Sequence, residues 1–285
     1  MNKLLEVKGL TKVYDHFTLD NINFSLEPGY IMGFVGVNGA GKTTTINLIL
    51  NAIKRDVGEI NIFGMDNLKD EKRIKQKIGV VFDNMFLVNE WNMLDVEKAY
   101  KLFYTEWDSE KYYSYLERFR LIPQTKIREL SRGMAVKLIL STALSHDAEL
   151  LILDEPTSGL DPAARDELME IFQEYIEDGK KSIIFSTHVT SDLEKIADYI
   201  TCINQGKIIY TGTKDDLLER YCLIKGGPDE YKEYEKYIIG VRKFSTGFEG
   251  LILRENLNRF NIKIAVEKPS IEEIIIFTNK GGRVK

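Results

Sequence analysis

Apolar runs of strand length alternate with turns over roughly the first 82 residues. These runs are Leu4–Val7, Leu19–Leu26, Ile31–Val35, Glu59–Phe63 and Ile78–Phe82. One segment, which follows Lys42, instead carries its apolar residues at helical spacing. Strands show a period of two, or are apolar throughout when both faces are buried, whereas a helix shows a period near 3.6. The pattern therefore predicts strands interrupted by one helix.

Between about residues 84 and 146 the pattern becomes helical. Asp95 and Ser109 are good capping residues, so we expect a helix to begin at each, and Pro123 to close the second. The leading segment, residues 84–91 (NMFLVNEW), is apolar and aromatic. Such residues suit a groove for a partner's helix, or equally the core of the helical part itself.

The alternation of strand and helix then returns. Leu150–Leu153 and Ile183–Phe185 are fully apolar, as expected of strands buried on both faces. Between them, Pro162 suits the first turn of a helix and Gly179 its end. Strand, helix and strand at this spacing predict parallel pairing with a right-handed crossover.

A third part begins near Gly212. Thr213 with Asp216 forms a capping box, and Ser270 is placed to cap a last helix. The strand-like runs between them are Tyr237–Val241, Leu251–Leu253 and Ile262–Val266. We therefore expect one large domain over residues 1–212, with the helical part 84–146 inserted, and a small α+β appendage over residues 213–285.

Composition changes this picture little. The chain has 285 residues, 44% hydrophobic and 29% charged, which is typical of a globular protein. A net charge of −5 does not favour nucleic acid as a partner. Cys202 and Cys222 lack metal-binding spacing and are expected to be reduced thiols. We find no signal-like segment and no apolar run of membrane-spanning length, so any role at a membrane is expected to need another chain.

Residues 36–43 (GVNGAGKT) match the phosphate-binding P-loop pattern. Small residues let backbone N–H groups approach a triphosphate, and the following helix directs its positive end at the phosphates. Lys42 would contact the β and γ phosphates, and Thr43 would offer a hydroxyl to Mg²⁺. By itself the loop predicts nucleotide binding and leaves open a GTPase, kinase, helicase or transporter.

Two carboxylates end the buried strand at Leu150–Leu153. Asp154 is placed to hold Mg²⁺ through water, the usual role of the second P-loop motif. Glu155 would face and polarise the attacking water. Acidic residues also often begin loops, so this pair gains meaning only beside the P-loop.

Further segments resemble the ATPases of ABC transporters. Residues 154–161 (DEPTSGLD) are similar to their Walker B and D-loop run, and residues 130–134 (LSRGM) to their LSGGQ signature. Residues 186–188 (STH) are similar to the switch-histidine segment, and Tyr14 to the aromatic residue that stacks on adenine. The resemblance runs in family order from residue 3 to about 215. The terminal PSIEE, residues 269–273, is similar to the close of exporter-type subunits.

The resemblance implies an α/β fold: a P-loop NTPase core with a mixed sheet, an antiparallel β-subdomain, an inserted helical subdomain and a small appendage. It implies ATP and Mg²⁺ as cofactors, with ATP hydrolysis coupled to transport. The implied partners are a separate multi-span membrane permease and a second ATP-binding subunit, the same chain or a paralogue, at the cytoplasmic face of the membrane.

The resemblance also assigns roles to individual residues. Glu155 and His188 would be catalytic, and the metal would be held by Thr43, Asp83 and Asp154. The nucleotide would contact Tyr14, Gly36, Asn38, Gly39, Ala40, Gly41, Lys42, Thr43, Thr44, Ser131, Gly133 and Asp161. In the family, Ser131 and Gly133 would close over the γ-phosphate held by the other subunit, and Asp161 would reach across the dimer. Phe17 competes with Tyr14 for the adenine, and Asp161 would also cap a helix.

The chain departs from the family pattern in two segments. Asp83 stands where a glutamine is usual, and Arg132 and Met134 replace glycine and glutamine in the signature. Both changes resemble a subgroup of exporter ATPases from Gram-positive bacteria, some of which handle antimicrobial or amphipathic peptides. Aspartate still ligates Mg²⁺, so we expect Asp83 to keep a linking role.

Two other classes of function compete with a transporter subunit: a soluble ATPase of cofactor assembly or translation, and a DNA-repair or chromosome ATPase. A DNA-repair ATPase of this family would need a long coiled-coil insertion between Gly41 and Ser131, where there is no room. Translation factors of the family usually carry two such domains in one chain. An ATPase of cofactor assembly stays open, although it would not need the appendage.

Overall fold

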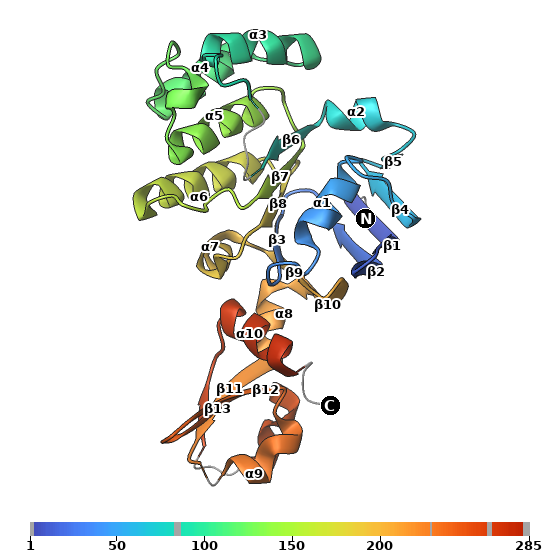
Figure 1. Cartoon of the computed structure of the whole chain (residues 1–285), viewed down its shortest axis with the longest axis vertical. Helices are drawn as coiled ribbons and strands as arrows, with labels where there is room; N and C mark the ends of the chain where they lie inside the picture. Colours follow the sequence, from blue (N-terminus) through green and yellow to red (C-terminus); the bar gives the residue numbers. More distant parts are fainter. Residues whose placement is uncertain (1–2, 83–86, 229, 261–263, 282–285) are drawn as a thin grey trace.

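The computed structural model describes residues 3–82, 87–228, 230–260 and 264–281, apart from the side chains of Glu233, Lys280 and Gly281. Its parts follow one another along the long axis of the molecule (Figure 1). A helical arm lies at one end, the sheets of the large domain in the middle, and the appendage at the other end.

The central sheet has the strand order β10-β9-β3-β8-β7-β6. Its strands are β3 (Ile31–Val35), β6 (Ile78–Val81), β7 (Leu150–Asp154), β8 (Ser182–Ser186), β9 (Tyr199–Asn204) and β10 (Lys207–Thr213). The strands from β9 to β6 pair in parallel, and β10 adds an antiparallel edge. The parallel pairing predicted for the two apolar runs at 150–153 and 183–185 is confirmed by β7 and β8.

Burial on both faces explains why these strands are apolar throughout. Ile31 and Val35 of β3 join the hydrophobic core on the side of the helices α5 (Arg132–Leu144), α6 (Pro162–Ile176) and α7 (Thr190–Ile196). Met32 and Phe34, which point the other way, join a second core. Successive side chains of a strand point to opposite faces, so each central strand contributes to both cores.

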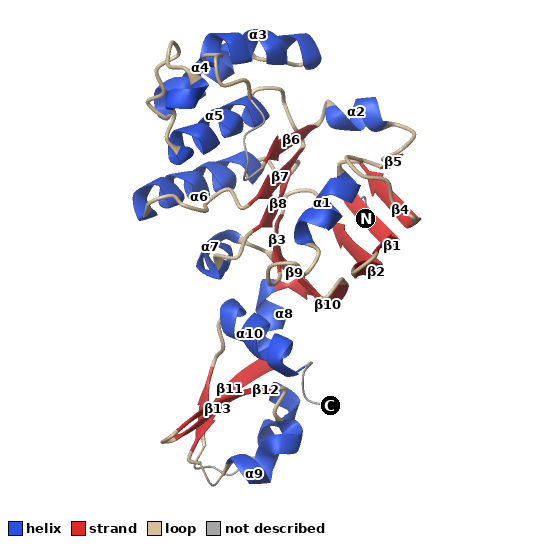
Figure 2. Ribbon diagram, in the orientation of Figure 1, coloured by secondary structure: helices blue, strands red, loops and turns tan. Residues whose placement is uncertain are grey.

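The second core is closed by an antiparallel sheet of order β2-β1-β4-β5. Its strands are β1 (Leu5–Tyr14), β2 (Phe17–Leu26), β4 (Val57–Ile62) and β5 (Met65–Asp66). Between the two sheets lies α1 (Lys42–Ile49), and α2 (Glu71–Lys75) leads back to β6 (Figure 2). The helix predicted after Lys42 is thereby confirmed.

The arm contains α3 (Met93–Phe103), α4 (Ser109–Arg118), a 3₁₀ turn (Ile127–Glu129) and α5. Both α3 and α4 begin earlier in the chain than the sequence predicts. Asn92 caps α3, and Asp95 stands at its third position, completing the capping box. Asp108 caps α4, where Ser109 is the first helical residue, and the helix ends at Arg118 rather than at Pro123.

The appendage is built on an antiparallel sheet of order β12-β13-β11-β14. Its elements are α8 (Lys214–Arg220), β11 (Tyr221–Gly226), α9 (Tyr231–Tyr234), β12 (Gly240–Phe244), β13 (Gly247–Leu253), β14 (Ala265–Glu267) and α10 (Ile271–Gly281), with 3₁₀ turns at Glu235–Tyr237 and Arg254–Arg259. The strand predicted at 237–241 lies three residues too early, because residues 235–237 form the first of these turns. The caps predicted at Thr213 and Ser270 are confirmed.

One face of this sheet has a core of its own, while the other joins the core of the large domain. Cys222, Ile224 and Ile252 pack with Tyr234 and Phe248. The opposite face contributes Leu223 and Leu251 to the core that holds the central helices. The domain boundary predicted near residue 212 therefore remains a proposal, because the appendage also contributes to the core of the large domain.

The α/β fold class predicted from the sequence is confirmed, with its mixed sheet, antiparallel β-subdomain and helical insertion. Cys202 and Cys222 are free and buried, and burial raises the pKa of the Cys202 thiol to about 12. Within the residues that the structure describes, no helix combines the length and apolar character needed to cross a bilayer.

Candidate nucleotide-binding site

The P-loop joins the buried strand β3 to α1 at the carboxyl edge of the central sheet. Glycine is required at two of its positions. A Cβ on Gly36 would lie 2.3 Å from the carbonyl oxygen of Ile203, and Gly41 adopts a φ of +114° as the residue preceding α1. The loop therefore packs tightly on β9 and turns sharply into a helix whose free N–H groups face the loop.

Lys42 is buried, with 8% of its surface exposed. Its ammonium group donates a hydrogen bond of 2.8 Å to the Gly36 carbonyl oxygen. Burial lowers the pKa of Lys42, and the nearby carboxylates of Glu155 and Asp154 act in the opposite direction. The amine is thus held at the loop beside two carboxylates, where a triphosphate would supply further negative charge.

Thr43 and Asp154 approach each other from α1 and the end of β7. The Thr43 hydroxyl donates to Oδ2 of Asp154 over 3.2 Å. Burial raises the pKa of the Asp154 carboxyl, while the Thr43 hydrogen bond lowers it. A hydroxyl and a carboxylate are hard oxygen ligands, and Mg²⁺ in nucleotide sites takes few protein ligands beside phosphate oxygens and water. These two residues therefore fit the predicted metal.

Glu155 and His188 are brought together by the pairing of β7 with β8. The Glu155 backbone has a φ of +55°, and its N–H donates to the Ser186 carbonyl oxygen over 2.8 Å. A non-glycine residue in this region is uncommon and is often found at functional sites. Nδ1 of His188 lies 2.5 Å from Oε2 of Glu155, and the His188 side chain is 56% exposed.

A cavity of about 650 Å³ opens over the P-loop and the two acidic residues, and His188 is not among the residues that line it. It is lined by His16, Phe17, Asn38, Gly39, Gly41, Lys42, Thr43, Thr44, Asp154 and Glu155. Tyr14, the predicted adenine platform, is not among the lining residues, and its ring centre lies 6.5 Å from that of Phe17. Phe17, the first residue of β2, thus faces the cavity together with His16 of the preceding turn, a residue that the sequence patterns did not single out.

The signature segment lies apart from this cavity. Ser131 caps α5, where its hydroxyl accepts from the Met134 N–H over 3.3 Å. Asp161 caps α6 and accepts from the Ala164 N–H over 2.9 Å, so its predicted capping role is confirmed. A Cβ on Gly133 would lie 3.2 Å from Leu160, which places the two segments side by side. Neither Ser131, Gly133 nor Asp161 lines the cavity of its own chain.

The remaining predicted site residues divide into two groups. Gly36 and Ala40 belong to the loop without being among the cavity's lining residues, and the Ala40 carbonyl oxygen accepts from the Gly206 N–H. Asp83 lies outside the described residues, so its proposed metal contact stays a prediction.

A P-loop, a buried lysine and two acidic residues at the carboxyl edge of a parallel sheet define a nucleotide-hydrolysing enzyme of the P-loop class. Comparison with known proteins narrows the class. Residues 19–158 match the family model described as ABC transporter.

Two curated relatives match beyond that segment. The linearmycin resistance ATP-binding protein LnrL of Bacillus subtilis is 35% identical, over 76% of this chain and 71% of the relative. The bacitracin transport ATP-binding protein BcrA of Bacillus licheniformis is 34% identical, over 77% and 73% respectively. A solved structure of the ATP-binding subunit of an ABC transporter superposes with a TM-score of 0.69 at 27% identity, over 75% of this chain and 91% of that one.

With these matches the chain belongs to the ATP-binding proteins of ABC transporters. It is an ATPase, and in this family ATP hydrolysis powers transport.

Replacing the two aromatic residues separately tests which one contacts the base. Phe17→Ala should weaken ATP binding by about 1–3 kcal/mol, the usual loss when an aromatic partner of a base is removed. Tyr14→Ala should weaken it less, because Tyr14 is 43% exposed and outside the cavity lining. Calorimetric titration with ATP measures both. A larger loss of ATP affinity in Tyr14→Ala than in Phe17→Ala would show that Tyr14, and not Phe17, stacks on the adenine.

Proposed function

We propose that this chain powers export of a drug, an antimicrobial compound or an amphipathic peptide through a separate multi-span permease. It would work at the cytoplasmic face of the membrane, where ATP is available. One observation carries the proposal: the phosphate cradle and the acidic residues share one cavity, whereas the signature residues lie outside it. The chain then holds one half of each of two different sites.

Within one half, the residues divide the work. The P-loop residues 36–44 would bind the phosphates, with Lys42 neutralising the β and γ groups. Thr43 and Asp154 would hold Mg²⁺, which when bound shields phosphate charge. Glu155 would accept a proton from the attacking water, and His188 would hydrogen-bond the γ-phosphate. The contact between Glu155 and His188 keeps these two groups next to each other.

The other half would come from a second ATP-binding subunit. Ser131, at the N-terminus of α5, presents a hydroxyl beside the positive end of the helix dipole, an arrangement suited to an anion. Gly133 and Asp161 lie in the same region, since a Cβ on Gly133 would come within 3.2 Å of Leu160, the residue before Asp161. These residues need a nucleotide bound to another copy or to a paralogue, so ATP would join the two subunits.

The exported substrate class is inferred from relatives and from the signature. The names of LnrL and BcrA refer to linearmycin resistance and bacitracin transport. Arg132 and Met134 in the signature, with Asp83 before the arm, resemble the exporter subgroup from Gram-positive bacteria. Together these support a substrate that is an antimicrobial or amphipathic molecule.

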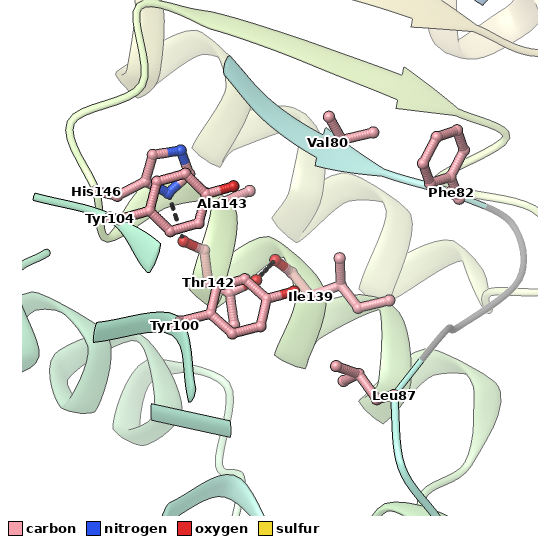
Figure 3. Close-up of a pocket in the computed structure, with 9 residues that line it drawn as sticks. All are labelled: Val80, Phe82, Leu87, Tyr100, Tyr104, Ile139, Thr142, Ala143 and His146. Atoms are coloured by element: carbon pink, nitrogen blue, oxygen red, sulfur yellow. Dashed lines mark hydrogen bonds between the residues drawn. The ribbon is translucent and has the colours of Figure 1, made fainter. Parts of the chain in front are cut away.

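The permease would dock on an apolar groove between the sheet and the arm (Figure 3). A cavity of about 230 Å³ is lined by Val80, Phe82, Leu87, Tyr100, Tyr104, Ile139, Thr142, Ala143 and His146. A neighbouring cavity of about 420 Å³ shares Leu87, Tyr100 and Tyr104 and extends to Trp91 and Phe103. Aromatic linings of this kind are typical of sites that receive a partner's helix.

The groove is connected to the catalytic residues through one strand. Val80 and Phe82 belong to β6 and its end, and β6 pairs in parallel with β7, so that Val81 lies opposite Leu153. Asp154 and Glu155 follow Leu153 directly. A partner that shifts the groove wall would therefore displace the strand next to the one that carries both acidic residues.

The assignment of Glu155 predicts a separation of binding from turnover. Glu155→Gln keeps the size of the side chain but removes the base, so turnover should fall by about 10²–10⁴-fold while ATP binding persists. The variant should accumulate as an ATP-bound dimer, measured by phosphate release and by light scattering. Glu149→Gln, at the residue before β7, is the matched control: its carboxylate pairs with Lys77 away from the cavity, and the variant should behave as wild type. If Glu155→Gln releases phosphate at the wild-type rate, Glu155 is not the base that activates the attacking water.

The docking groove predicts a set of variants that uncouple the partner. Leu102 and Phe103, at the end of α3, are 86% and 74% exposed beside the groove. Leu102→Asp with Phe103→Asp should abolish co-purification with the permease, because burying two carboxylates in an apolar contact is strongly unfavourable. The ATPase rate of the isolated chain should not change.

Val57→Asp, on the exposed start of β4, is the control for an added surface charge. If the double variant still co-purifies with the permease, the docking surface lies elsewhere. If the wild-type chain co-purifies with no membrane protein, an ATPase of cofactor assembly becomes the better reading.

A further inference from the structure

The helix that follows His188 makes a direct contact with the last helix of the chain. Helix α7 begins at Thr190, two residues after His188. Near its other end, Oε1 of Glu194 accepts a hydrogen bond of 2.9 Å from the backbone N–H of Ile271, the first residue of α10. These two residues are 77 positions apart in the sequence.

The Glu194 contact complements the cap that α10 already has. Ser270 accepts from the Glu273 N–H, and the Glu273 carboxylate accepts from the Ser270 N–H. The first N–H groups of a helix lack partners within it, and Glu194 supplies one for Ile271 from another element. A carboxylate at this end also interacts favourably with the helix dipole. The backbone oxygen of Glu194 accepts from Lys214 Nζ, which ties α7 to the start of α8 as well.

Apolar packing supports the same contact. Ile271, Ile274 and Phe277 of α10 are buried in one core with Leu193 and Ile196 of α7. On its other side α10 lies against β12, where a Cβ on Gly240 would come within 2.1 Å of the Phe277 carbonyl oxygen. α10 is thus held by the appendage on one side and holds α7 on the other.

The far half of α10 faces the P-loop. Ile276 and Asn279 line a cavity of about 540 Å³ together with residues 37–40 of the loop and with Asn204 and Gln205. Asn38 and Gly39 also line the nucleotide cavity. One helix therefore lies beside both sides of the nucleotide site, the loop that would hold the phosphates and the helix that follows His188.

We propose that Glu194 is a positioning residue for His188, and that α10 thereby makes the appendage part of the γ-phosphate site. The inference rests on the proposed role of His188. Because only residues 187–189 connect β8 to α7, the placement of α7 restrains where the His188 side chain lies. Loss of the Glu194 contact should affect the response to the γ-phosphate and leave the rest of nucleotide binding intact.

The test compares two nucleotides that differ in the γ-phosphate. Calorimetric titration of the full chain with Mg²⁺ and the ATP analogue AMP-PNP should show the Kd of Glu194→Ala raised by about three- to tenfold, as for a weakened hydrogen bond to a charged group. The Kd for ADP should stay within about twofold of wild type, because ADP lacks the group that His188 would contact. Glu194→Gln keeps an acceptor oxygen and should restore most of the AMP-PNP affinity.

Glu272→Ala is the matched control, since it removes an exposed carboxylate from the same first turn of α10. It should leave both affinities unchanged. An equal loss of ADP and AMP-PNP affinity in Glu194→Ala, or no loss of either, would overturn the inference, as would the same effect in Glu272→Ala.

His188→Ala separates failure of the inference from failure of the proposed function. If His188→Ala weakens AMP-PNP binding and Glu194→Ala does not, only the positioning role is lost. If His188→Ala leaves AMP-PNP affinity unchanged, the proposed contact of His188 with the γ-phosphate is wrong and the inference fails with it.

Discussion

A buried ammonium group is the feature on which the site depends. Lys42 lies at the carboxyl edge of the central sheet, and removing its charge from water is costly unless other groups compensate. The Gly36 carbonyl oxygen accepts from it, and two carboxylates at the end of β7 lie close enough to oppose the effect of burial on its pKa. A triphosphate fits this setting because it brings the negative charge that a buried cation favours.

The surrounding architecture keeps those groups in place. In β7 and β8, which are buried on both faces, the polar residues stand at the strand ends, so Asp154, Glu155 and His188 meet at one edge of the sheet. The signature residues begin and border helices on another part of the surface. Because these two sets of residues lie apart within one chain, we infer that each complete site is shared between two subunits. The last helix adds a link from the appendage to the same edge.

The parts predictable from the sequence were those determined by local patterns. The P-loop, the buried strands and the acidic pair need only residue type and spacing, and the structure places Lys42, Thr43, Asp154 and Glu155 around one cavity. The helices of the arm begin one to three residues before their predicted starts, because Asn92 and Asp108 cap a helix as well as Asp95 and Ser109 do.

Other features depend on contacts that no local pattern reveals. The pairing of β1 with β2 places Tyr14 and Phe17 opposite each other on one face of the sheet, so no local pattern separates them. Phe17 is distinguished by its packing on the P-loop, where a Cβ on Gly41 would lie 3.0 Å from its ring. The contact of Glu194 with Ile271 joins segments far apart in the chain, and the appendage shares its core with the large domain.

The central claim is that each site is completed by a second subunit. Measuring ATPase rate per subunit against protein concentration, with sedimentation to report assembly, tests it most directly. The account predicts a rate that rises with concentration as ATP-bound dimers form, and a rate independent of concentration in a chain shown to stay monomeric would contradict it.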